Sequence, residues 1–552
     1  MKQPFLILFT LVFGFNIIYS QKKLTENEKL FATAKVWGFL KYYHPSVSEG
    51  NFDWDNELFK ILPKVKESTN AEQLSEIYIN WIESLGEVET CKKCSRENKS
   101  LLFENNFDLG WIDGNLLISD KLSQKLKFIE QNRHLGEKHY ITYSNTGSIK
   151  VINEIDYADF DWNNKNLRIL TLFRYWNIVE YFFPYKYQMD SPWNEVLYKM
   201  IPKFLNPRSA VDFHLALMEL VAHLDDGHAN ISTDLIMSFF GDYWMPQKIE
   251  LVEDKAVVTE YYNEKLAKPF DLRIGDVITK LDNKTLDELL LEKEKYISGS
   301  NISKKKQKAS YTIFRGSNDS VRVEYIREGK RLNTMIKRFP LDNLNYNWAE
   351  ERKGIKETYK IFDGNIGYVN LGRLTIKEVP KVMKALESMK AIIFDIRNYP
   401  QATLFSISNY ITSNKSDFYK LLLPNLDYPG QFIWGHTGKA GNNKLKYTGT
   451  VVLLVSEKTQ SHAEFTTMCL QTGDNVTTIG SQTAGADGNI SRFDTVGGFK
   501  TQMSGLGIFY PDGTETQRVG IRIDIEVKPT IDGIKQGRDE VLEKAMEFIK
   551  QN

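Results

Sequence analysis

Ser461 is the residue of this chain whose setting most directly suggests chemistry. It opens the stretch SHAEF, which follows an apolar run at 451–455 (VVLLV) and begins an expected helix. At the N-terminus of a helix the dipole favours developing negative charge, and the next backbone amide, that of His462, can donate to an oxyanion. The setting therefore suits a serine that attacks a carbonyl group.

The same residues also form a capping box. In S-H-A-E the Ser461 hydroxyl can accept from the backbone N–H three residues on, while Glu464 reaches back to the Ser461 N–H. One hydroxyl cannot cap the helix and attack a carbonyl at the same time. Taken alone, these four residues favour the helix cap. For Ser461 to act as a nucleophile, the chain must also supply a base that accepts its proton.

His228, which lies in the stretch HLDDGHA, is the candidate for that base. An imidazole has an unperturbed pKa near 6.5 and suits general-base work at neutral pH. The alternative is a surface histidine after a helix-ending Asp-Asp-Gly turn. Among the other histidines, His462 points away from Ser461 because adjacent side chains diverge on a helix. His223 is expected in the core, and His436 is the best rival base.

The elements that must position these residues are clearest in the C-terminal part. From residue 361 onward, apolar segments alternate with helical patterns, and the expected strands lie within 365–371, 391–398, 451–455 and 477–485. Fully apolar strands between helices indicate a sheet covered on both faces. The C-terminal edge of such strands is a usual place for a site. We therefore expect an α/β core that carries Ser461 at this edge.

Residues 241–340 show a different pattern. KIELV, AVVTEYY, DVITKLD, VRVEYIRE and TMIKRF are short, β-branched and partly alternating segments, which are typical of strands. The segment at 272–286 (LRIGDVITKLDNKTL) resembles the G-D-x-I segment of a PDZ domain, a fold that binds peptides by strand addition. We expect a small β-rich, PDZ-like domain here.

The N-terminal part contains one helical unit twice. Residues 30–65 and 169–204 align without a gap at an offset of 139, which pairs Trp37 with Trp176. Apolar residues recur at helical spacing in each copy, so the aromatic stripe is expected in a packed core. At the same offset His228 falls on a glutamate. The scaffold repeats and the histidine does not, which favours a role for His228 beyond packing.

Length and charge limit the class of protein. The chain has 552 residues, which at roughly 150 residues per domain predicts three or four domains. Lys and Arg total 71, as do Asp and Glu, and no long basic run occurs, which argues against nucleic acid as a main partner.

The N-terminus resembles a secretory signal peptide. A lysine precedes an apolar stretch at 4–18 that is short for a membrane span. We expect a periplasmic or extracellular protein that starts near Gln21 and has no stable membrane insertion after cleavage. The alternative is an uncleaved N-terminal anchor.

The three cysteines predict no metal site. Cys91 and Cys94 form a single C-x-x-C, which cannot complete a four-ligand zinc site, and an exported chain favours a local disulfide. Cys469 occupies an apolar helical position and is expected in the core. Since no metal or nucleotide motif occurs, we expect no cofactor.

Several motifs occur together in one order. They are HLDDGHA, the G-D-x-I segment, IGYVNLGRL, IIFDIRN, SHAEF, IGSQTAGADG and GIRIDIEVKPTIDGIKQGRDEVLEKA. This ordered set, over about residues 220–550, resembles the tail-specific or C-terminal processing serine proteases, and more closely their tricorn-core-like branch. The resemblance implies a crotonase-like α/β core, a PDZ domain and peptide-bond cleavage through an acyl-enzyme. The family's S-x-[AGS]-[DE] segment maps the nucleophile to Ser461.

The resemblance also bears on the base. In the lysine-dependent branch the base follows the serine by about 25 residues, and Ala486 holds that position here. An alanine cannot accept a proton, and Lys458 and Lys500 have no motif support. The tricorn-like branch uses a histidine that maps to His228. The serine that precedes this histidine in the pattern is Gly227 here.

Two further parts of the pattern are altered. The acidic position falls on Gln517, which can orient a partner without adding charge, and Glu515 could supply a charge if the loop register differs. The family's D-L-R-x-N-x-G-G turn, which serves the oxyanion hole, reads DIRNYPQA at 395–402 and lacks both glycines. Backbone N–H groups of Gln401 or Ala402 could still donate, since every non-proline residue carries one.

Together these observations predict an α/β protein with a crotonase-like C-terminal protease core, an N-terminal duplicated all-α module and a small PDZ-like β-rich domain. The expected divisions are a signal peptide at 1–20, the helical region at 21–240, the PDZ-like domain at 241–340 and the protease core at 341–552.

The predicted function is that of an exported serine peptidase acting on proteins or peptides. Ser461 attacks, His228 is the base, and Gln517 or Glu515 orients the histidine. The amide of His462 and one near Ala402 hold the oxyanion. The alternative is a catalytically weak or inactive peptide-binding protein on the same scaffold, which the altered turn and the missing acid favour.

Overall fold

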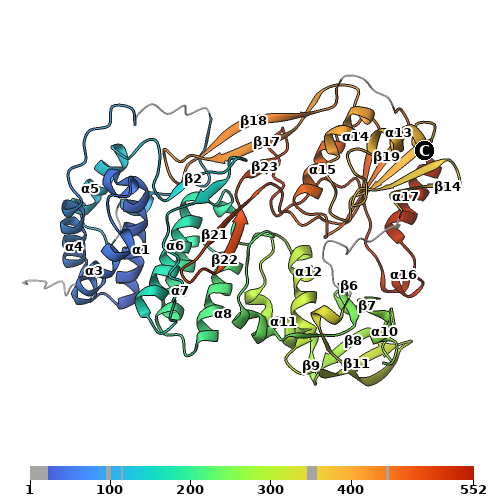
Figure 1. Cartoon of the computed structure of the whole chain (residues 1–552), viewed down its shortest axis with the longest axis horizontal. Coiled ribbons are helices and arrows are strands. Elements are labelled where there is room, and N and C mark those ends of the chain that lie inside the picture. The colour runs from blue at the N-terminus through green and yellow to red at the C-terminus, as the bar shows by residue number, and fades with distance from the viewer. Residues whose placement is uncertain (1–22, 95–100, 114–115, 345–356, 443–446) are drawn as a thin grey trace, which may run out of the picture.

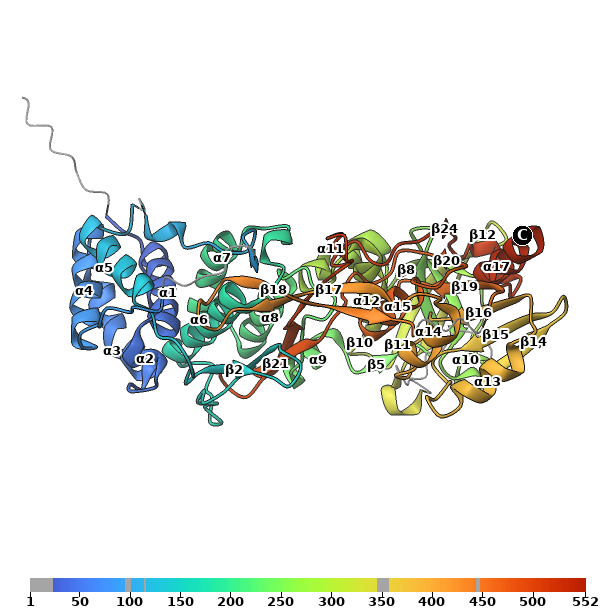
Figure 2. The same cartoon turned by 90° about the horizontal axis from the view of Figure 1, so that it is seen from above.

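The computed structural model describes residues 23–94, 101–113, 116–344, 357–442 and 447–552. The molecule is elongated, with a helical region at one end and an α/β core at the other (Figures 1 and 2). A separate β-sheet lies beside the α/β core. The expected signal peptide lies outside the described residues. In the described part of the chain no helix is both long and apolar enough to cross a membrane.

The α/β core is built on a six-stranded sheet of order β14-β15-β16-β19-β20-β24. The strands are β14 (Tyr359–Phe362), β15 (Ile366–Asn370), β16 (Ala391–Asp395), β19 (Thr450–Val455), β20 (Val476–Gly480) and β24 (Ile525–Glu526). All neighbours from β15 to β24 run parallel, and only β14 is antiparallel. The strands expected from the apolar segments are therefore confirmed.

Helices cover both faces of this sheet. Alternate strand residues point to opposite faces, so Phe394 and Leu453 lie in one core cluster while Ile393 and Val452 lie in another. The first cluster contains side chains of α13 (Val379–Leu386), α14 (Leu404–Ile411) and α15 (His462–Leu470), and the second those of α17 (Glu540–Gln551). The sheet is buried on both sides, as its apolar strands require, and Ser461 precedes α15 beyond the C-terminal end of β19.

The second sheet is antiparallel and has the order β12-β11-β8-β7-β6, with β9 paired to β8. Its strands are β6 (Gln247–Val252), β7 (Lys255–Tyr261), β8 (Val277–Leu281), β9 (Lys284–Thr285), β11 (Ser320–Arg327) and β12 (Lys330–Lys337). All five short segments expected as strands are strands. The edge strand β6 lies against α12 (Ile302–Ile313), which also borders the α/β core.

The helical region contains two sets of three helices in the same order. They are α1 (Glu26–Tyr43), α3 (Trp54–Glu67) and α4 (Ala71–Ser84), then α6 (Lys165–Phe182), α7 (Trp193–Leu205) and α8 (Ala210–Ala222). Each set holds a reciprocal tryptophan pair: the indole of Trp37 donates to the Trp54 carbonyl and that of Trp54 to the Trp37 carbonyl, at 3.2 and 3.1 Å. Trp176 and Trp193 do the same at 2.9 and 3.0 Å.

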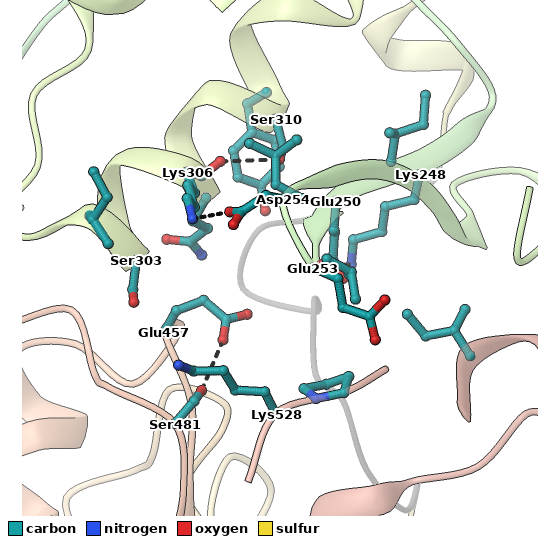
Figure 3. Close-up of a pocket in the computed structure, with 18 of the residues that line it drawn as sticks. Lys248, Glu250, Glu253, Asp254, Ser303, Lys306, Ser310, Glu457, Ser481 and Lys528 are labelled. Carbon is teal, nitrogen blue, oxygen red and sulfur yellow. Dashed lines mark hydrogen bonds and ion pairs between the residues drawn. The ribbon is translucent and has the colours of Figure 1, made fainter. Parts of the chain in front are cut away.

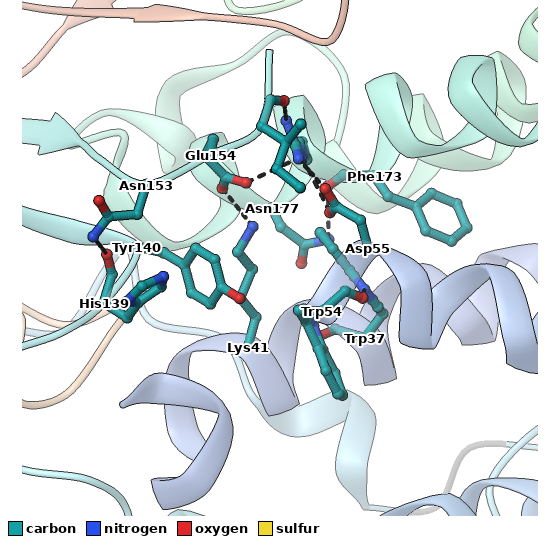
Figure 4. Close-up of polar contacts among 12 residues, drawn as sticks. Trp37, Lys41, Trp54, Asp55, His139, Tyr140, Asn153, Glu154, Phe173 and Asn177 are labelled. Carbon is teal, nitrogen blue, oxygen red and sulfur yellow. Dashed lines mark hydrogen bonds and ion pairs between the residues drawn. The ribbon is translucent and has the colours of Figure 1, made fainter. Parts of the chain in front are cut away.

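A buried ion cluster joins the two sets (Figure 4). Arg174 on α6 pairs with Asp55 on α3 and with Glu154, and Glu154 also pairs with Lys41 on α1. These side chains are at most 10% exposed. Burial of the cluster is tolerated because each charge has an opposite partner and further hydrogen bonds.

A long hairpin of the α/β core reaches over the helical region, as Figure 1 shows. It consists of β17 (Ser416–Pro424) and β18 (Phe432–Ala440), and β18 pairs with β1 (Leu102–Phe103) from the helical end of the chain. Phe432 at the start of β18 is fully buried in the same core cluster as α1 and α6. The hairpin therefore shares one core with the helical region.

The cysteine predictions are confirmed. Cys91 and Cys94 form a disulfide, and Cys469 is free and buried in α15.

Candidate active site

Ser461 and His228 line the same cavity, which has a volume of about 530 Å³. His228 lies in the segment after α8, and Lys304 and Lys308 come from α12. The turn after β16 contributes residues 397–399, and the segment at 488–490 forms another wall. Residues as far apart in the chain as 228 and 502 thus line one cavity. The sequence predicted that Ser461 and His228 would lie together.

Ser461 has a strained backbone. Its φ is 58° and its ψ is −124°, in a region that residues other than glycine rarely adopt. Its N–H donates to the Ala486 carbonyl at 3.0 Å, and its hydroxyl makes a long contact of 3.4 Å with the Gly488 carbonyl. Strained residues of this kind cluster at functional sites, where the surrounding structure holds them in place.

Glu464 supplies that surrounding structure. Its buried carboxylate accepts from the Thr483 hydroxyl at 2.6 Å and from the N–H groups of Gly485 and Ala486 at 2.8 and 3.0 Å. It also accepts from the Ser461 N–H at 3.2 Å, which is one half of the expected capping box. Burial raises the pKa of Glu464, and these hydrogen bonds lower it. One side chain therefore fixes the loop at 483–486 against the start of α15.

His228 is oriented through a serine. Its Nδ1 lies 2.9 Å from the Ser504 hydroxyl, and that hydroxyl donates to Asp226 Oδ1 at 2.9 Å. A serine has one proton to donate, so Ser504 accepts from His228. This arrangement places the imidazole proton on Nδ1 and leaves the lone pair on Nε2, which has no hydrogen-bond partner among the described residues.

Asp226 holds this arrangement from behind. It is fully buried, and it accepts from the His228 N–H at 3.0 Å and from the Ser504 N–H at 2.7 Å. Burial lowers the pKa of His228 to about 4, while the Asp226 charge raises it and those of Lys304 and Lys308 lower it. The imidazole is therefore neutral at pH 7 and able to accept a proton.

The two residues expected to orient His228 lie elsewhere. Gln517 is buried and reaches Asp226 at 3.4 Å, so any effect on His228 passes through that carboxylate. Glu515 accepts from the Tyr187 hydroxyl at 2.7 Å and, among the described residues, makes no hydrogen bond with the histidine. Sequence reasoning missed Asp226 and Ser504. The signal for Asp226 was its place two residues before the histidine, whereas Ser504 lies in β22 (Lys500–Ser504) without a motif.

Gly227, which replaces a serine of the family pattern, is required by close packing. A Cβ at this position would lie 2.9 Å from Ala486 Cβ and 3.0 Å from the Ser300 hydroxyl. The histidine segment therefore packs directly on the residue whose carbonyl accepts from Ser461. This contact links the His228 segment to the Ser461 segment.

The backbone donors differ from those expected. Gln401 N–H donates to the Leu371 carbonyl at 3.2 Å, so this amide already has an acceptor within the fold. Ala402 is exposed and is not part of the cavity wall, which Asn398 and Tyr399 form instead. The proline between Tyr399 and Gln401 fixes this turn. The His462 amide, next to Ser461, keeps its expected position at the start of α15.

Most of the rival bases lie away from the cavity. His436 is exposed on β18, and His223 ends α8 as a half-buried residue rather than in the core as expected. Lys500 lies on β22 outside the cavity wall. Lys458 lines the cavity, but its ammonium pairs with Glu250 at 2.7 Å.

A second cavity of about 270 Å³ lies on the other side of α12 (Figure 3). It is bordered by the edge strand β6, by α12 and by residues of the α/β core such as Glu457 and Lys528. Gln307 and Tyr311 of α12 line both cavities, so the two adjoin.

Comparisons with known proteins bear on the family and the fold. Residues 365–527 match the model of peptidase family S41. The structure of mature CPAF complexed with lactacystin is similar to this one, with a TM-score of 0.56, 13% identity, and coverage of 70% of this chain and 99% of that chain. The photosystem II D1 C-terminal processing protease has a TM-score of 0.37 and 16% identity, with coverage of 68% of this chain and 98% of that chain. No curated protein sequence matches.

The likeness to CPAF shows a shared fold, and the family match covers both the parallel strands and Ser461. Residues 365–527 therefore form a peptidase family S41 domain, and the chain is a serine-type peptidase.

Proposed function

We propose that the protein hydrolyses peptide bonds through an acyl-enzyme on Ser461, with His228 as the base. The observation that carries this proposal is the shared cavity: a strained serine at a helix N-terminus faces the same space as a neutral, oriented histidine. The nucleophile, the base and the group that orients the base are the parts that serine peptidases need.

The proposed reaction has two stages, acylation of Ser461 and then deacylation. Ser461 Oγ bonds to the carbonyl carbon as its proton moves to His228 Nε2, and the His462 amide donates to the oxyanion. A backbone N–H of Asn398 or Tyr399, which line the cavity wall, is proposed as the second donor. When the C–N bond breaks, His228 gives the proton to the leaving amine. His228 then takes a proton from the water molecule that attacks the ester carbonyl, and it returns this proton to Ser461 Oγ as the acid leaves.

Asp226 takes the role that the missing acid plays in the family pattern. It acts through Ser504, since the imidazolium formed during the reaction donates to Ser504 and Ser504 donates to the carboxylate. A carboxylate that orients a histidine also stabilises its charged form. Gln517 supports Asp226 with a contact of 3.4 Å.

The other regions are proposed to handle the substrate. The sheet of β6 to β12, which we propose is PDZ-like, has a free edge at β6 beside the second cavity (Figure 3). A peptide added to this edge would lie next to Gln307 and Tyr311, which also line the catalytic cavity. We propose further that the helical region is a duplicated module and that the protein is exported, with the N-terminal apolar segment as its signal.

Labelling with a fluorophosphonate probe tests the nucleophile. We expect wild type to be labelled and Ser461→Ala not to be. His228→Ala should reduce the labelling rate by about 10²- to 10⁴-fold, the usual contribution of a general base. Wild-type protein that is folded by circular dichroism but never labelled would instead support the inactive peptide-binding alternative. If His228→Ala is labelled at the wild-type rate, the base is wrongly assigned.

A further inference from the structure

The cavity at Ser461 carries charge of one sign. The basic residues on its wall, apart from His228, are Lys304, Lys308, Lys458 and Arg397. Its lining residues include no aspartate or glutamate. Lys458 and Arg397 reach carboxylates outside the wall, Glu250 at 2.7 Å and Asp395 at 2.6 Å, so their charges are compensated within the protein.

The charge of Lys308 is not compensated in this way. Its ammonium donates to the Ala229 carbonyl at 3.2 Å and to the Ser298 hydroxyl at 2.9 Å, and both acceptors are neutral. An ammonium has three protons to donate, and the structure describes no third acceptor for this one. The carboxylate that most favours its charge is Asp226, which is already bonded to Ser504 and His228.

Burial makes this lysine sensitive to an anion. Desolvation, together with the nearby Lys304 charge, lowers the pKa of Lys308 to about 7. A buried charge without an opposite partner is costly, and an anion within hydrogen-bond reach removes much of that cost. Lys304 lies one helical turn earlier on α12, on the same face as Lys308. Its ammonium donates to Gln307 at 2.6 Å.

We propose that Lys308, supported by Lys304, binds a carboxylate of the substrate inside the catalytic cavity and thereby selects which peptides reach Ser461. This inference rests on the proposed peptidase function and names the substrate class: peptides with a carboxylate close to the scissile bond. The carboxylate can be the C-terminus of the peptide or the side chain of an aspartate or glutamate.

Binding to the full chain with Ser461→Ala tests the proposal without cleavage. The probe is a pool of fluorescein-labelled decapeptides made in four forms, with a free or amidated C-terminus and with Asp and Glu or Asn and Gln inside. We expect at least one carboxylate form to bind about 10-fold or more tightly than the neutral form, as for one hydrogen bond to a charged group. Preference for the free C-terminus assigns a terminal carboxylate, and preference for Asp and Glu assigns a side chain.

Variants of Lys308 assign the effect to this residue. In the same Ser461→Ala chain, Lys308→Met should reduce the preference to less than about 3-fold, whereas Lys308→Arg should retain it because the charge and donors remain. Lys544→Met, on the exposed face of α17, is the matched control and should keep the full preference.

Equal binding of all four peptide forms, or a preference that Lys308→Met leaves intact, overturns the inference. The proposed function is judged separately, by fluorophosphonate labelling of the wild type. A labelled protein without carboxylate preference therefore retains its function and loses only this inference.

Discussion

At the scale of single residues, the histidine is the group whose environment makes a measurable prediction. His228 acts as a base only when neutral, and burial lowers its pKa to about 4. The kcat/KM for a neutral, amidated peptide should therefore fall as pH drops through about 4 and be level from about pH 6 upward, because kcat/KM reports the free enzyme. The measurement is a pH profile, restricted to the range in which circular dichroism shows folded protein.

Asp226→Asn provides the control for this profile. The Asp226 charge raises the pKa of His228, so its removal should move the acidic limb to lower pH as well as reduce the rate. A limb near pH 7 would contradict His228 as the base and point to Lys308, whose pKa burial lowers to about 7.

A second prediction at this scale concerns the effect of Ser504 on catalysis. Ser504→Ala removes the acceptor for the Nδ1 proton of His228 and one donor to Asp226. The kcat/KM should fall by at least about 10-fold and at most about 10⁴-fold, the loss known when a triad histidine has the wrong tautomer. Ser504→Thr keeps the hydroxyl and should retain more activity than Ser504→Ala. Equal activity of Ser504→Ala and wild type would show that the relay has no catalytic role.

How much of this site was predictable differs from residue to residue. Ser461 and His228 were found because each lies in a motif at the end of a recognisable element. Ser504 was not, since a serine on a β-strand carries no local signal and its role depends on tertiary contacts with Asp226. For Gln401, the sequence shows that an amide exists but not that the Leu371 carbonyl already accepts from it.

At the scale of elements, α1 and α6 pack through positions that correspond at the offset of 139. Gly38 of α1 faces its counterpart Asn177 of α6, and a Cβ on Gly38 would lie 1.7 Å from Asn177 Oδ1. The Asn177 amide donates to the carbonyls of Ala34 and Phe173, which correspond in the same way, at 3.0 and 2.9 Å. The helices thus cross at equivalent positions, and one small and one large residue fill the contact.

This crossing predicts how exchanging Gly38 and Asn177 changes the stability of the protein. Gly38→Asn alone places two large side chains at one point, and overpacking of this kind costs about 1–3 kcal/mol or more of unfolding free energy. Asn177→Gly alone leaves a space and loses two hydrogen bonds. In the double variant Gly38→Asn/Asn177→Gly the asparagine faces a glycine again, so stability should recover beyond the sum of the single effects. Urea unfolding measures all three, and strict additivity would contradict the crossing.

The strand and helix pattern of the α/β core was more predictable than the helix crossing. The apolar segments at β15, β16 and β19 are buried on both faces, so their sequences identify them without tertiary information. The pairing of β18 with β1 and of β22 with β4 (Asn230–Ile231) joins distant parts of the chain. Short strands of this kind have no periodicity from which to predict them.

At the scale of the whole molecule, the site depends on parts that lie far apart in the chain. His228 follows the helical region, Lys308 belongs to α12, and Ser461 belongs to the α/β core. The strand β4, which directly follows the His228 segment, pairs with β22, which carries Ser504. The position of the base is therefore coupled to the same shared core that joins the hairpin of β17 and β18 to α1 and α6.

Phe432→Ala tests this coupling. Phe432 is fully buried in the shared core, and loss of its ring should cost about 3–5 kcal/mol. Eight of the ten tryptophans precede residue 245, so tryptophan fluorescence reports mainly on the helical region, while fluorophosphonate labelling reports on Ser461. Because the hairpin packs into this shared core and also against α15, the variant should lower both thermal midpoints together. Phe405→Ala, at a ring that is 51% exposed on α14, should lower neither by more than a small amount. If Phe432→Ala lowers the midpoint of the fluorescence transition while the labelling of Ser461 keeps its wild-type midpoint, the two ends unfold independently.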